Sequence, residues 1–370
     1  MNLAAHLAAL PPAEASGLRA VAERLRQLPE REPSADLTER ILRAVNTEHS
    51  RPPFRAPKLW RVAAVLVATL ALVALYLRFG VPAVRDAQAD DGSCWIAAAQ
   101  EADGTWQPAR HGGAEAYRPA LTALSALALD RADGRKYADP IGRACKALAA
   151  LQNEDGAFGG NGRERYYNHA MTTFALAALA SDRPGLKPVL ERALAFSRAS
   201  QTVEGGWDYE PGSDGNAALT SWQVRALAEM RRIGFAEAEI PLRKGLRWLR
   251  GTLREDGHVA YHRGTRNPSE CLDALTAHTL ITAGGAYAGL ADLGRQVAGR
   301  LNPAEPEDVA DCYRDYAKTL AFAAAGAAEQ AARVSRQMIA HHQAGARDQW
   351  ERVGGRLYTA ALTRLAVGAL

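Results

Sequence analysis

"QEADGTW", residues 100–106, is followed by three related stretches, "QNEDGAF" (152–158), "QTVEGGW" (201–207) and the more divergent "LREDGHV" (253–259). The acidic residue before the glycine falls at positions 103, 155, 204 and 256, so the intervals are 52, 49 and 52 residues. A fixed period in this range is typical of stacked supersecondary units. The chain is therefore organised as a repeat.

Each position of this seven-residue loop has a structural interpretation. The acidic residue can accept free amides at a helix start, the glycine permits a left-handed bend, and the aromatic residue covers the joint. The glutamine at the end of the preceding helix ties loop to helix. The residues interpreted in this way are Gln100, Asp103, Gly104, Trp106, Gln152, Asp155, Gly156, Phe158, Gln201, Glu204, Gly205, Trp207, Asp256 and Gly257.

Helices of two kinds alternate between the loops. One kind is apolar on nearly all faces, which predicts buried helices at 117–130, 168–181, 216–230, 270–284, 311–326 and 358–370. The other kind carries charge on one face, from the short "CWIAAAQ" (94–100) to "AEQAARVSRQMIAHHQ" (328–343). Six helices of each kind predict an all-α fold with an inner and an outer ring, closed on itself as an α/α toroid.

The pattern Gln-x-x-Asp-Gly-x-Trp before an apolar helix resembles the repeat of squalene and oxidosqualene cyclases and of protein prenyltransferase β subunits. The segments "LTSWQVRALAEMRRIGF" and "GGRLYTAALTRLAV" look like bacterial prenyltransferase/squalene-oxidase repeat proteins. The likeness covers roughly residues 92–370. It implies a toroid of the terpenoid cyclase/protein prenyltransferase type and leaves the activity open.

The catalytic signatures of these relatives are only partly present. No Asp-x-Asp-Asp acid motif occurs, and 7% aromatic residues is a poor supply for stabilising a carbocation, so terpene cyclisation is disfavoured. Prenyltransferases bind zinc through Asp-x-Cys and a later His. The nearest residues here, Cys271, His278, Asp311 and Cys312, depart from that spacing. We therefore expect no cofactor and keep zinc at these residues as a weaker alternative.

The four cysteines fall at equivalent places in adjacent repeats. Cys94 and Cys145 both precede a repeat glutamine, and Cys271 and Cys312 both begin a later helix. We hypothesise two disulfides, between Cys94 and Cys145 and between Cys271 and Cys312. The alternatives are four buried thiols or, for the second pair, the zinc site.

Polar and aromatic residues on the predicted inner helices form a candidate ligand pocket. Convergence of several such groups at the mouth of a closed ring would make it the default binding site. The alternative is that they are helix caps and satisfied core polar groups. The candidates are His169, Trp222, Asp273, His278, Asp311, Tyr313, Asp315 and Tyr358, together with Tyr167.

An apolar stretch at residues 61–78 divides the chain. It predicts a transmembrane helix at 59–80, with a buried core helix as the alternative. Lys and Arg are more frequent on its N-terminal side, which predicts a cytoplasmic segment 1–58, a linker 81–91 and an extracytoplasmic toroid 92–370. The expected location is the cell membrane, with a single span.

The sequence predicts two short amphipathic helices within residues 1–58, with apolar stripes at Leu18, Val21, Leu25 and Leu28 and after Ser34. Helices this short need a partner to cover their apolar stripes. The arrangement weakly resembles a transmembrane anti-sigma factor, although the zinc motif of many such proteins is absent. The resemblance implies a sigma factor as cytoplasmic partner, and the alternative is a tail that only sets topology.

These observations favour a membrane-anchored binding or sensing protein whose toroid holds an apolar ligand or a protein. A purely structural repeat module and an isoprenoid-acting enzyme are the alternatives, with the balance against an enzyme. The net charge of +4 over 370 residues and the lack of a basic block in the repeat region argue against nucleic-acid binding.

Overall fold

The computed structural model describes residues 92–209, 213–265, 269–303, 310–345, 348 and 350–370. The chain divides into two units, Met1–Pro82 and Ala83–Leu370, and the described residues belong to the second. Within them, no helix has both the length and the apolar character that crossing a membrane requires. The segments 1–58, 59–80 and 81–91 lie outside the described residues, so the predicted span, cytoplasmic partner and location stay predictions.

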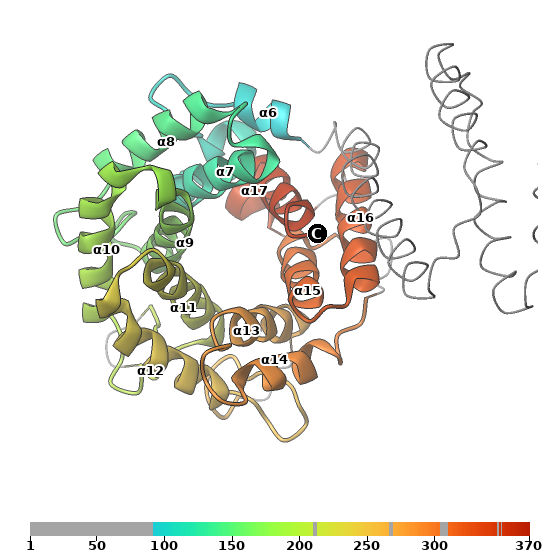
Figure 1. Ribbon diagram of the computed structural model, residues 1–370. Helices are drawn as coiled ribbons and strands as arrows, with labels where there is room; N and C mark the ends of the chain where they lie inside the picture. The colour runs from blue at the N-terminus through green and yellow to red at the C-terminus, as the bar shows by residue number, and fades with distance from the viewer. Residues whose placement is uncertain (1–91, 210–212, 266–268, 304–309, 346–347, 349) are drawn as a thin grey trace, which may run out of the picture. The chain divides into compact units, whose positions relative to one another are not determined.

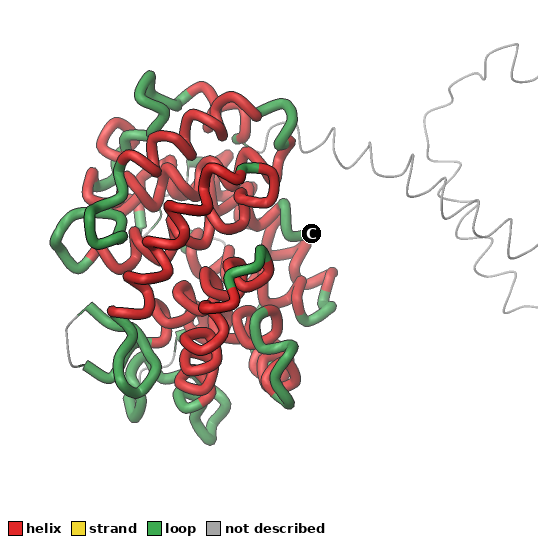
Figure 2. Tube along the Cα trace, turned by 60° about the vertical axis from the view of Figure 1, so that its left-hand side comes forward, coloured by secondary structure: helices red, strands yellow, loops and turns green. Residues whose placement is uncertain are grey.

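The described residues form two concentric rings of helices (Figure 1), and Figure 2 draws only helices and loops among them. The inner ring comprises α7 (Arg118–Asp133), α9 (Glu164–Leu179), α11 (Ala217–Arg232), α13 (Glu270–Thr282), α15 (Cys312–Ala324) and α17 (Glu351–Val367). The outer ring comprises α6 (Ser93–Ala98), α8 (Ala138–Ala150), α10 (Lys187–Ala199), α12 (Glu239–Arg250), α14 (Leu290–Ala298) and α16 (Ala328–Ala344). The all-α toroid with six inner and six outer helices is confirmed. Short 3-10 helices lie between them, at Pro108–His111, Glu115–Tyr117, Ala180–Asp182, Pro184–Leu186 and Ala236–Ala238.

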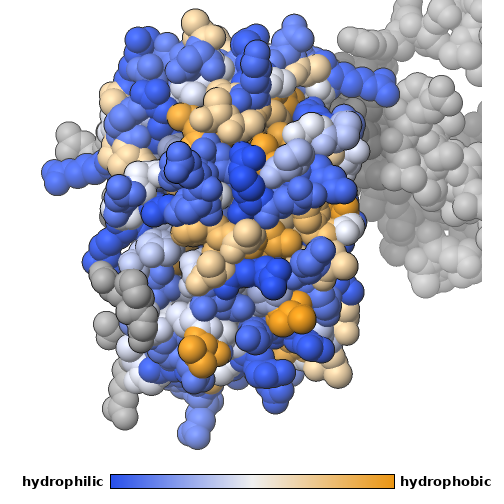
Figure 3. All heavy atoms as spheres, turned by 90° about the vertical axis from the view of Figure 1, so that its left-hand side faces the viewer, coloured by the Kyte–Doolittle hydropathy of each residue, from blue (hydrophilic) through white to orange (hydrophobic). Residues whose placement is uncertain are grey.

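The two rings differ in which faces they bury. Inner helix α7 buries every residue from Pro119 to Leu129, because it packs between two inner neighbours, the outer ring and the lumen. Outer helix α12 buries only the side that faces inward and exposes its arginines. The face of the ring drawn in Figure 3 is accordingly mostly hydrophilic, with apolar patches between the hydrophilic residues.

The repeat loops have the predicted glycine turn and buried aromatic residue. The acid accepts the following amide in three of the four loops, whereas in the third loop Thr202 Oγ1 accepts it in place of Glu204. Gly104, Gly156, Gly205 and Gly257 all have positive φ, between 85° and 100°. A Cβ on Gly156 would lie 2.2 Å from the carbonyl oxygen of Arg192 in α10, so a side chain is excluded as well as disfavoured by φ. The loop tryptophans, Trp106 and Trp207, have no solvent exposure.

The loop glutamines join neighbouring repeats. Gln152 follows α8, and its Nε2 donates both to the carbonyl of Gly156 in its own loop, at 3.0 Å, and to that of Val189 in α10, at 2.9 Å. Gln100 and Gln201 make the equivalent pair of bonds. Each glutamine therefore ties its loop to the next outer helix along the chain.

Two pairs of glycines close the ring where α17 packs beside α7. Ala114 N donates to Val353 O at 2.9 Å, and a Cβ on Gly113 would lie 2.5 Å from the carbonyl carbon of Gly354. Gly355 adopts φ 60° and ψ −160°, which few other residues tolerate. The motifs "HGG" (111–113) and "VGG" (353–355) thus let the two ends of the repeat array meet through their backbones.

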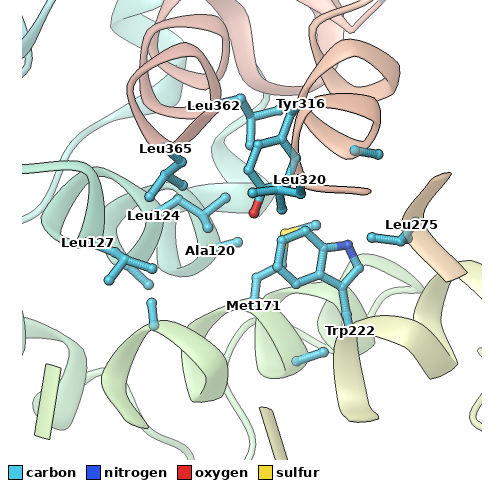
Figure 4. Close-up of a cluster of buried hydrophobic side chains, with 14 of the residues drawn as sticks. Ala120, Leu124, Leu127, Met171, Trp222, Leu275, Tyr316, Leu320, Leu362 and Leu365 are labelled. Carbon is cyan, nitrogen blue, oxygen red and sulfur yellow. The ribbon is translucent and has the colours of Figure 1, made fainter. Parts of the chain in front are cut away.

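Side chains fill the middle of the ring and leave a cavity at each end. Leu124, Met171, Trp222, Tyr316 and Leu320 converge from the inner helices in Figure 4. N-terminal residues of the inner helices line one cavity, the N-terminal mouth: Ala120, Tyr167, Ala218, Leu272 and Tyr313. C-terminal residues line the other, the C-terminal mouth: Leu127, Phe174, Ala228, Thr282 and Leu320. The inner helices therefore all run in the same direction.

Candidate functional site

The N-terminal mouth is a cavity of about 710 Å³ lined largely by aromatic side chains. Six of the eleven tyrosines of the chain line it, together with one tryptophan: Tyr117, Tyr167, Tyr209, Tyr261, Tyr313, Tyr358 and Trp350. A cavity of this size and lining is typical of a small-ligand site.

One wall is a row of three tyrosines. Tyr167 projects from α9, and its ring centroid lies 5.8 Å from that of Tyr209 in the loop before α11. The hydroxyls of Tyr209 and Tyr261 lie 3.3 Å apart. The guanidinium of Arg163 covers the Tyr209 ring at 4.7 Å, which holds that ring in place.

A second aromatic group comes from the last two inner helices. Tyr313 in α15 lies 5.6 Å from Trp350 and 6.4 Å from Tyr358, measured between ring centroids. Below them, Trp222 donates from Nε1 to the Tyr313 hydroxyl at 2.8 Å. Packing on several sides therefore fixes these rings before any ligand binds.

Burial keeps the phenols of the mouth uncharged. It raises the pKa of Tyr167, Tyr209, Tyr261, Tyr313 and Tyr358 above the ordinary value of tyrosine. Each phenol can therefore donate and accept a hydrogen bond at neutral pH, and none supplies a tyrosinate nucleophile.

Asp311, His262 and Cys271 are the titratable side chains that line the mouth beside the tyrosines among the described residues. Asp311 caps α15, and its Oδ1 accepts from Arg314 N at 3.0 Å and from Trp350 Nε1 at 2.9 Å. His262 donates from Nδ1 to Gly215 O at 2.8 Å, with Asp208 at 3.6 Å from the same nitrogen. That bond leaves His262 Nε2 as a proton acceptor.

The structure places three of the predicted pocket residues, Asp311, Tyr313 and Tyr358, on the N-terminal mouth, and Trp222 directly beneath it. Tyr167 also lines this mouth. These residues come from the N-terminal ends of inner helices or from the layer just below, which is why they converge.

Two other candidates serve the packing of the rings. His169 turns outward from α9, where its Nε2 lies 2.8 Å from Ser197 Oγ in α10, and burial lowers its pKa to about 3. Asp273 accepts from Val259 N at 2.7 Å and lies 2.7 Å from His258 Nδ1, so it holds the fourth repeat loop.

The last two candidates lie elsewhere in the ring. Asp315 is 1% exposed and lines a small cavity with Met338 and Thr363 on the outward side of α15. Burial raises its pKa to about 6, against the opposing effect of Arg314, whose Nε donates to it at 3.0 Å. His278 lines the C-terminal mouth, at the opposite end of the ring from Asp311.

Neither hypothesised disulfide is formed, since all four cysteines are free thiols. Cys94 Sγ lies 3.5 Å from the Tyr137 hydroxyl, and burial raises the pKa of the Cys145 thiol to about 11. The four zinc candidates do not converge either, because Cys271 lines one mouth and His278 the other. No group of three or more metal-ligating side chains occurs in the described part of the chain.

Sequence reasoning missed several residues of the mouth: Tyr117, Tyr209, Tyr261, His262 and Trp350. Tyr209 and Tyr261 carried a usable signal, since each follows by two residues the last position of a repeat loop and the two are 52 residues apart, one repeat period. Trp350 stands in the aromatic position of a sequence that begins 91 residues after Asp256, well beyond the 49–52-residue interval of the other loops, so the repeat period did not point to it.

Solved structures with this ring include the α-1,6-mannanase GH76A of Salegentibacter sp. HEL1_6, at 10% identity and a TM-score of 0.56, covering 76% of this chain and 97% of that chain. An inactive variant of that mannanase in complex with α-1,6-mannotriose matches at 11% identity and a TM-score of 0.55, over 76% of this chain and 98% of that chain. At this identity the likeness shows the fold. No curated protein matches the chain.

These neighbours correct the expected function. They are carbohydrate-active enzymes, which contradicts the expectation of a membrane-anchored binding or sensing protein and its isoprenoid-acting and purely structural alternatives. The repeat motif misled us because it encodes loop and helix packing, which does not specify a reaction.

A family model described as the prenyltransferase alpha-alpha toroid domain matches residues 30–181 and 62–259. Together the two matches span more than half of the 370 residues. This confirms the toroid part of the resemblance, while the likeness to an anti-sigma factor is without support. The chain belongs to the prenyltransferase alpha-alpha toroid domain family.

Proposed function

We propose that this protein is a carbohydrate-active enzyme that binds a neutral oligosaccharide in the N-terminal mouth and hydrolyses a glycosidic bond there. One observation carries the proposal: the mouth combines fixed aromatic rings, uncharged hydroxyls and the carboxylate of Asp311. The complex of a mannanase of the same fold with α-1,6-mannotriose supports a sugar chain as the ligand.

The lining suits the two chemical faces of a sugar. A pyranose ring has an apolar face of C–H groups, which packs on an aromatic ring, and a rim of hydroxyls, which needs hydrogen-bond partners. In the mouth, Tyr209 and Tyr313 offer both a ring and a neutral hydroxyl. A cavity of about 710 Å³ is also large enough for more than one sugar unit.

Hydrolysis of a glycosidic bond needs a group that gives a proton and a group that takes one. Asp311 and His262 supply the carboxyl and imidazole groups among the described lining residues, and they come from different repeats. The Cys271 thiol also lines the mouth, but burial raises its pKa well above the ordinary value. In this proposal His262, oriented by Gly215 and Asp208, acts as the base. It takes the proton of the attacking water, and the Asp311 carboxyl group gives its proton to the leaving oxygen of the glycosidic bond.

The test measures binding of α-1,6-mannotriose and of neutral manno- and gluco-oligosaccharides by calorimetry, and release of reducing ends in parallel. Asp311→Asn keeps an acceptor for Arg314 and Trp350, so it should retain binding while hydrolysis falls by about 10²-fold or more. Tyr209→Ala and Tyr313→Ala should weaken binding, because each removes a stacking surface and a hydroxyl.

Asp292→Asn is the matched control, since that carboxylate is 71% exposed on outer helix α14, where it pairs with Arg295. It should change neither binding nor hydrolysis. The proposal fails if no oligosaccharide of the panel binds, or if Asp311→Asn hydrolyses the bound sugar as fast as the wild type.

A further inference from the structure

The C-terminal mouth is a second cavity, of about 560 Å³, and its chemistry differs from that of the N-terminal mouth. Four arginines line it against a single acidic residue, Glu229. The arginines are Arg131, Arg225, Arg231 and Arg232. Its remaining walls are mostly apolar and include Leu127, Phe174, Leu320 and Leu365.

Arg225 is the unusual member of this set. It lies inside the ring on α11 and is 4% exposed. Its Cζ lies 4.2 Å from the ring centroid of Trp222 and 4.5 Å from that of Phe174, and its Nη2 donates to the Tyr316 hydroxyl at 2.9 Å. Its Nε and Nη1 have no hydrogen-bond partner within the described ring.

No carboxylate of the described residues lies within ion-pair distance of Arg225. Glu229, one helical turn away, pairs with Arg232 at 2.7 Å, and Arg231 pairs with Glu239. Contact with aromatic faces offsets part of the cost of burying the charge. It does not satisfy the two remaining N–H groups, and an uncompensated buried cation is costly.

A second unpartnered group lines the same cavity. His278 on α13 has no partner for Nδ1 in the described part of the chain. Burial, with the nearby charge of Arg225, lowers the pKa of His278 well below its ordinary value. The neutral imidazole can therefore donate a hydrogen bond to an anion without adding a second buried charge.

We propose that the C-terminal mouth binds a small organic anion, with its carboxylate or phosphate group on Arg225 and its apolar body against the leucines and Phe174. The planar guanidinium presents its free N–H groups in the fork that such oxygens match. The other three arginines of the cavity, Arg131, Arg231 and Arg232, are called the rim arginines here, and their positive charge attracts the anion. A protein surface would not reach Arg225, because its side chain lies within the ring and lines the cavity there.

The test titrates the full chain, at ionic strength held constant with NaCl, with inorganic phosphate, phenyl phosphate, acetate and benzoate. Calorimetry and the thermal melting temperature give the readout, and benzyl alcohol is the neutral control. We expect saturable binding, tighter for phenyl phosphate and benzoate than for inorganic phosphate and acetate because of the apolar walls. The tighter of phenyl phosphate and benzoate identifies the head group.

Arg225→Gln should weaken binding about tenfold or more, because it removes a charge-assisted hydrogen bond. Arg110→Gln is the matched control: this arginine is exposed, pairs with Glu101 and does not line the cavity, so binding should not change. If Arg225→Gln does not fold, Arg225→Lys and the rim double variant of Arg131→Gln with Arg231→Gln replace it, and weaker binding is again expected.

Three results would overturn the proposal. One is a wild type without saturable binding of any of the four anions. Another is benzyl alcohol binding as tightly as benzoate. The third is unchanged affinity in the folded Arg225 and rim variants, which would leave Arg225 as a packing residue held only by its aromatic neighbours.

Discussion

The first three repeat loops and the fourth share a turn but differ in what holds it. In the third loop, Trp207 is fully buried and donates from its indole Nε1 to Ser197 O at 2.8 Å. Its backbone N–H donates to Thr220 Oγ1 at 3.0 Å. In the fourth loop, Val259 replaces the aromatic residue and Asp273 replaces the threonine. Leu253 stands where the other three loops have a glutamine.

Only the acidic residue and the glycine occur in all four loops. The comparison therefore separates the residues that form the turn from those that join one repeat to the next. The turn itself needs the positive φ of the glycine and an acceptor for the amide two residues after the acid, which is the aspartate in three loops and Thr202 Oγ1 in the third. Joining one repeat to the next depends on the glutamine and the aromatic residue. The fourth joint lacks both and relies on a carboxylate–imidazole contact, so we expect its contribution to stability to be smaller and dependent on pH.

The aromatic position should show the largest difference. Trp207→Ala should lower the free energy of unfolding by about 3–5 kcal/mol, because it opens a cavity and leaves Ser197 O without its donor. Val259→Ala in the fourth loop should cost about 2 kcal/mol or less. Urea unfolding followed by circular dichroism measures both, and equal losses would remove the distinction between the joints.

The glycine position tests the turn and its neighbour together. Gly156→Ala should cost on the order of 2–3 kcal/mol, since the new Cβ meets both an unfavourable φ and the backbone of Arg192. Gly257→Ala has a similar φ, but its Cβ meets only the movable guanidinium of Arg300, so about 1 kcal/mol is expected. A larger loss in Gly257→Ala would show that the fourth joint is as rigid as the second.

The glutamine position should give a smaller effect. Gln152→Ala removes the donor shared by the carbonyls of Gly156 and Val189 and should cost roughly 1–2 kcal/mol. Leu253→Gln is the reciprocal variant, and it should stabilise the fourth joint by up to about 1 kcal/mol if the glutamine alone supplies the tie. Destabilisation by Leu253→Gln would mean that a glutamine at this position cannot reach the acceptors that it bonds in the other three loops.

The pH dependence should be the smallest effect. Burial raises the pKa of Asp273 above 3.8, although His258 and the amide of Val259 oppose the shift. An acid with a raised folded pKa contributes stability at low pH and loses it as the pH rises through that pKa. The wild type should therefore show a decline in unfolding free energy above pH 4 that is shallower in Asp273→Asn, and identical slopes would rule out this residue as the cause.

Periodicity carried the prediction of the fold because the loop residues act locally. Gly104 and Trp106 have the same role in their repeat as Gly205 and Trp207 have in theirs, so the spacing of four short motifs predicted a repeat. The alternation of two kinds of helix between the motifs then predicted the two rings. The same reasoning missed the glycine seam, where residues 111–113 and 353–355 meet and close the ring. Its glycines at 113 and 354 belong to the first and last repeats of the ring, and no local pattern links them.

The candidate site was predicted less well, because the inner helices are apolar on nearly every face. On such a helix the sequence does not tell whether a polar residue points to the lumen, as Tyr313 does, or to the outer ring, as His169 does. Nor does it tell which end of the ring a residue faces. His278 and Cys271 share a helix face but lie at opposite mouths, since two helical turns separate them.

The glycine seam also has a consequence for the order of folding. A solenoid can grow from any repeat, because each unit needs only its neighbour. Here Arg364 donates to the carbonyl of Arg131 across 233 positions, and Ala114 to that of Val353. During synthesis the side of α7 that packs against α17 thus stays exposed to solvent until α17 has left the ribosome. The last step of folding is a long-range closure, which sets a slow rate and exposes an apolar helix face to other chains while it is pending. A circular permutant opened elsewhere would move that step to a new joint without removing it.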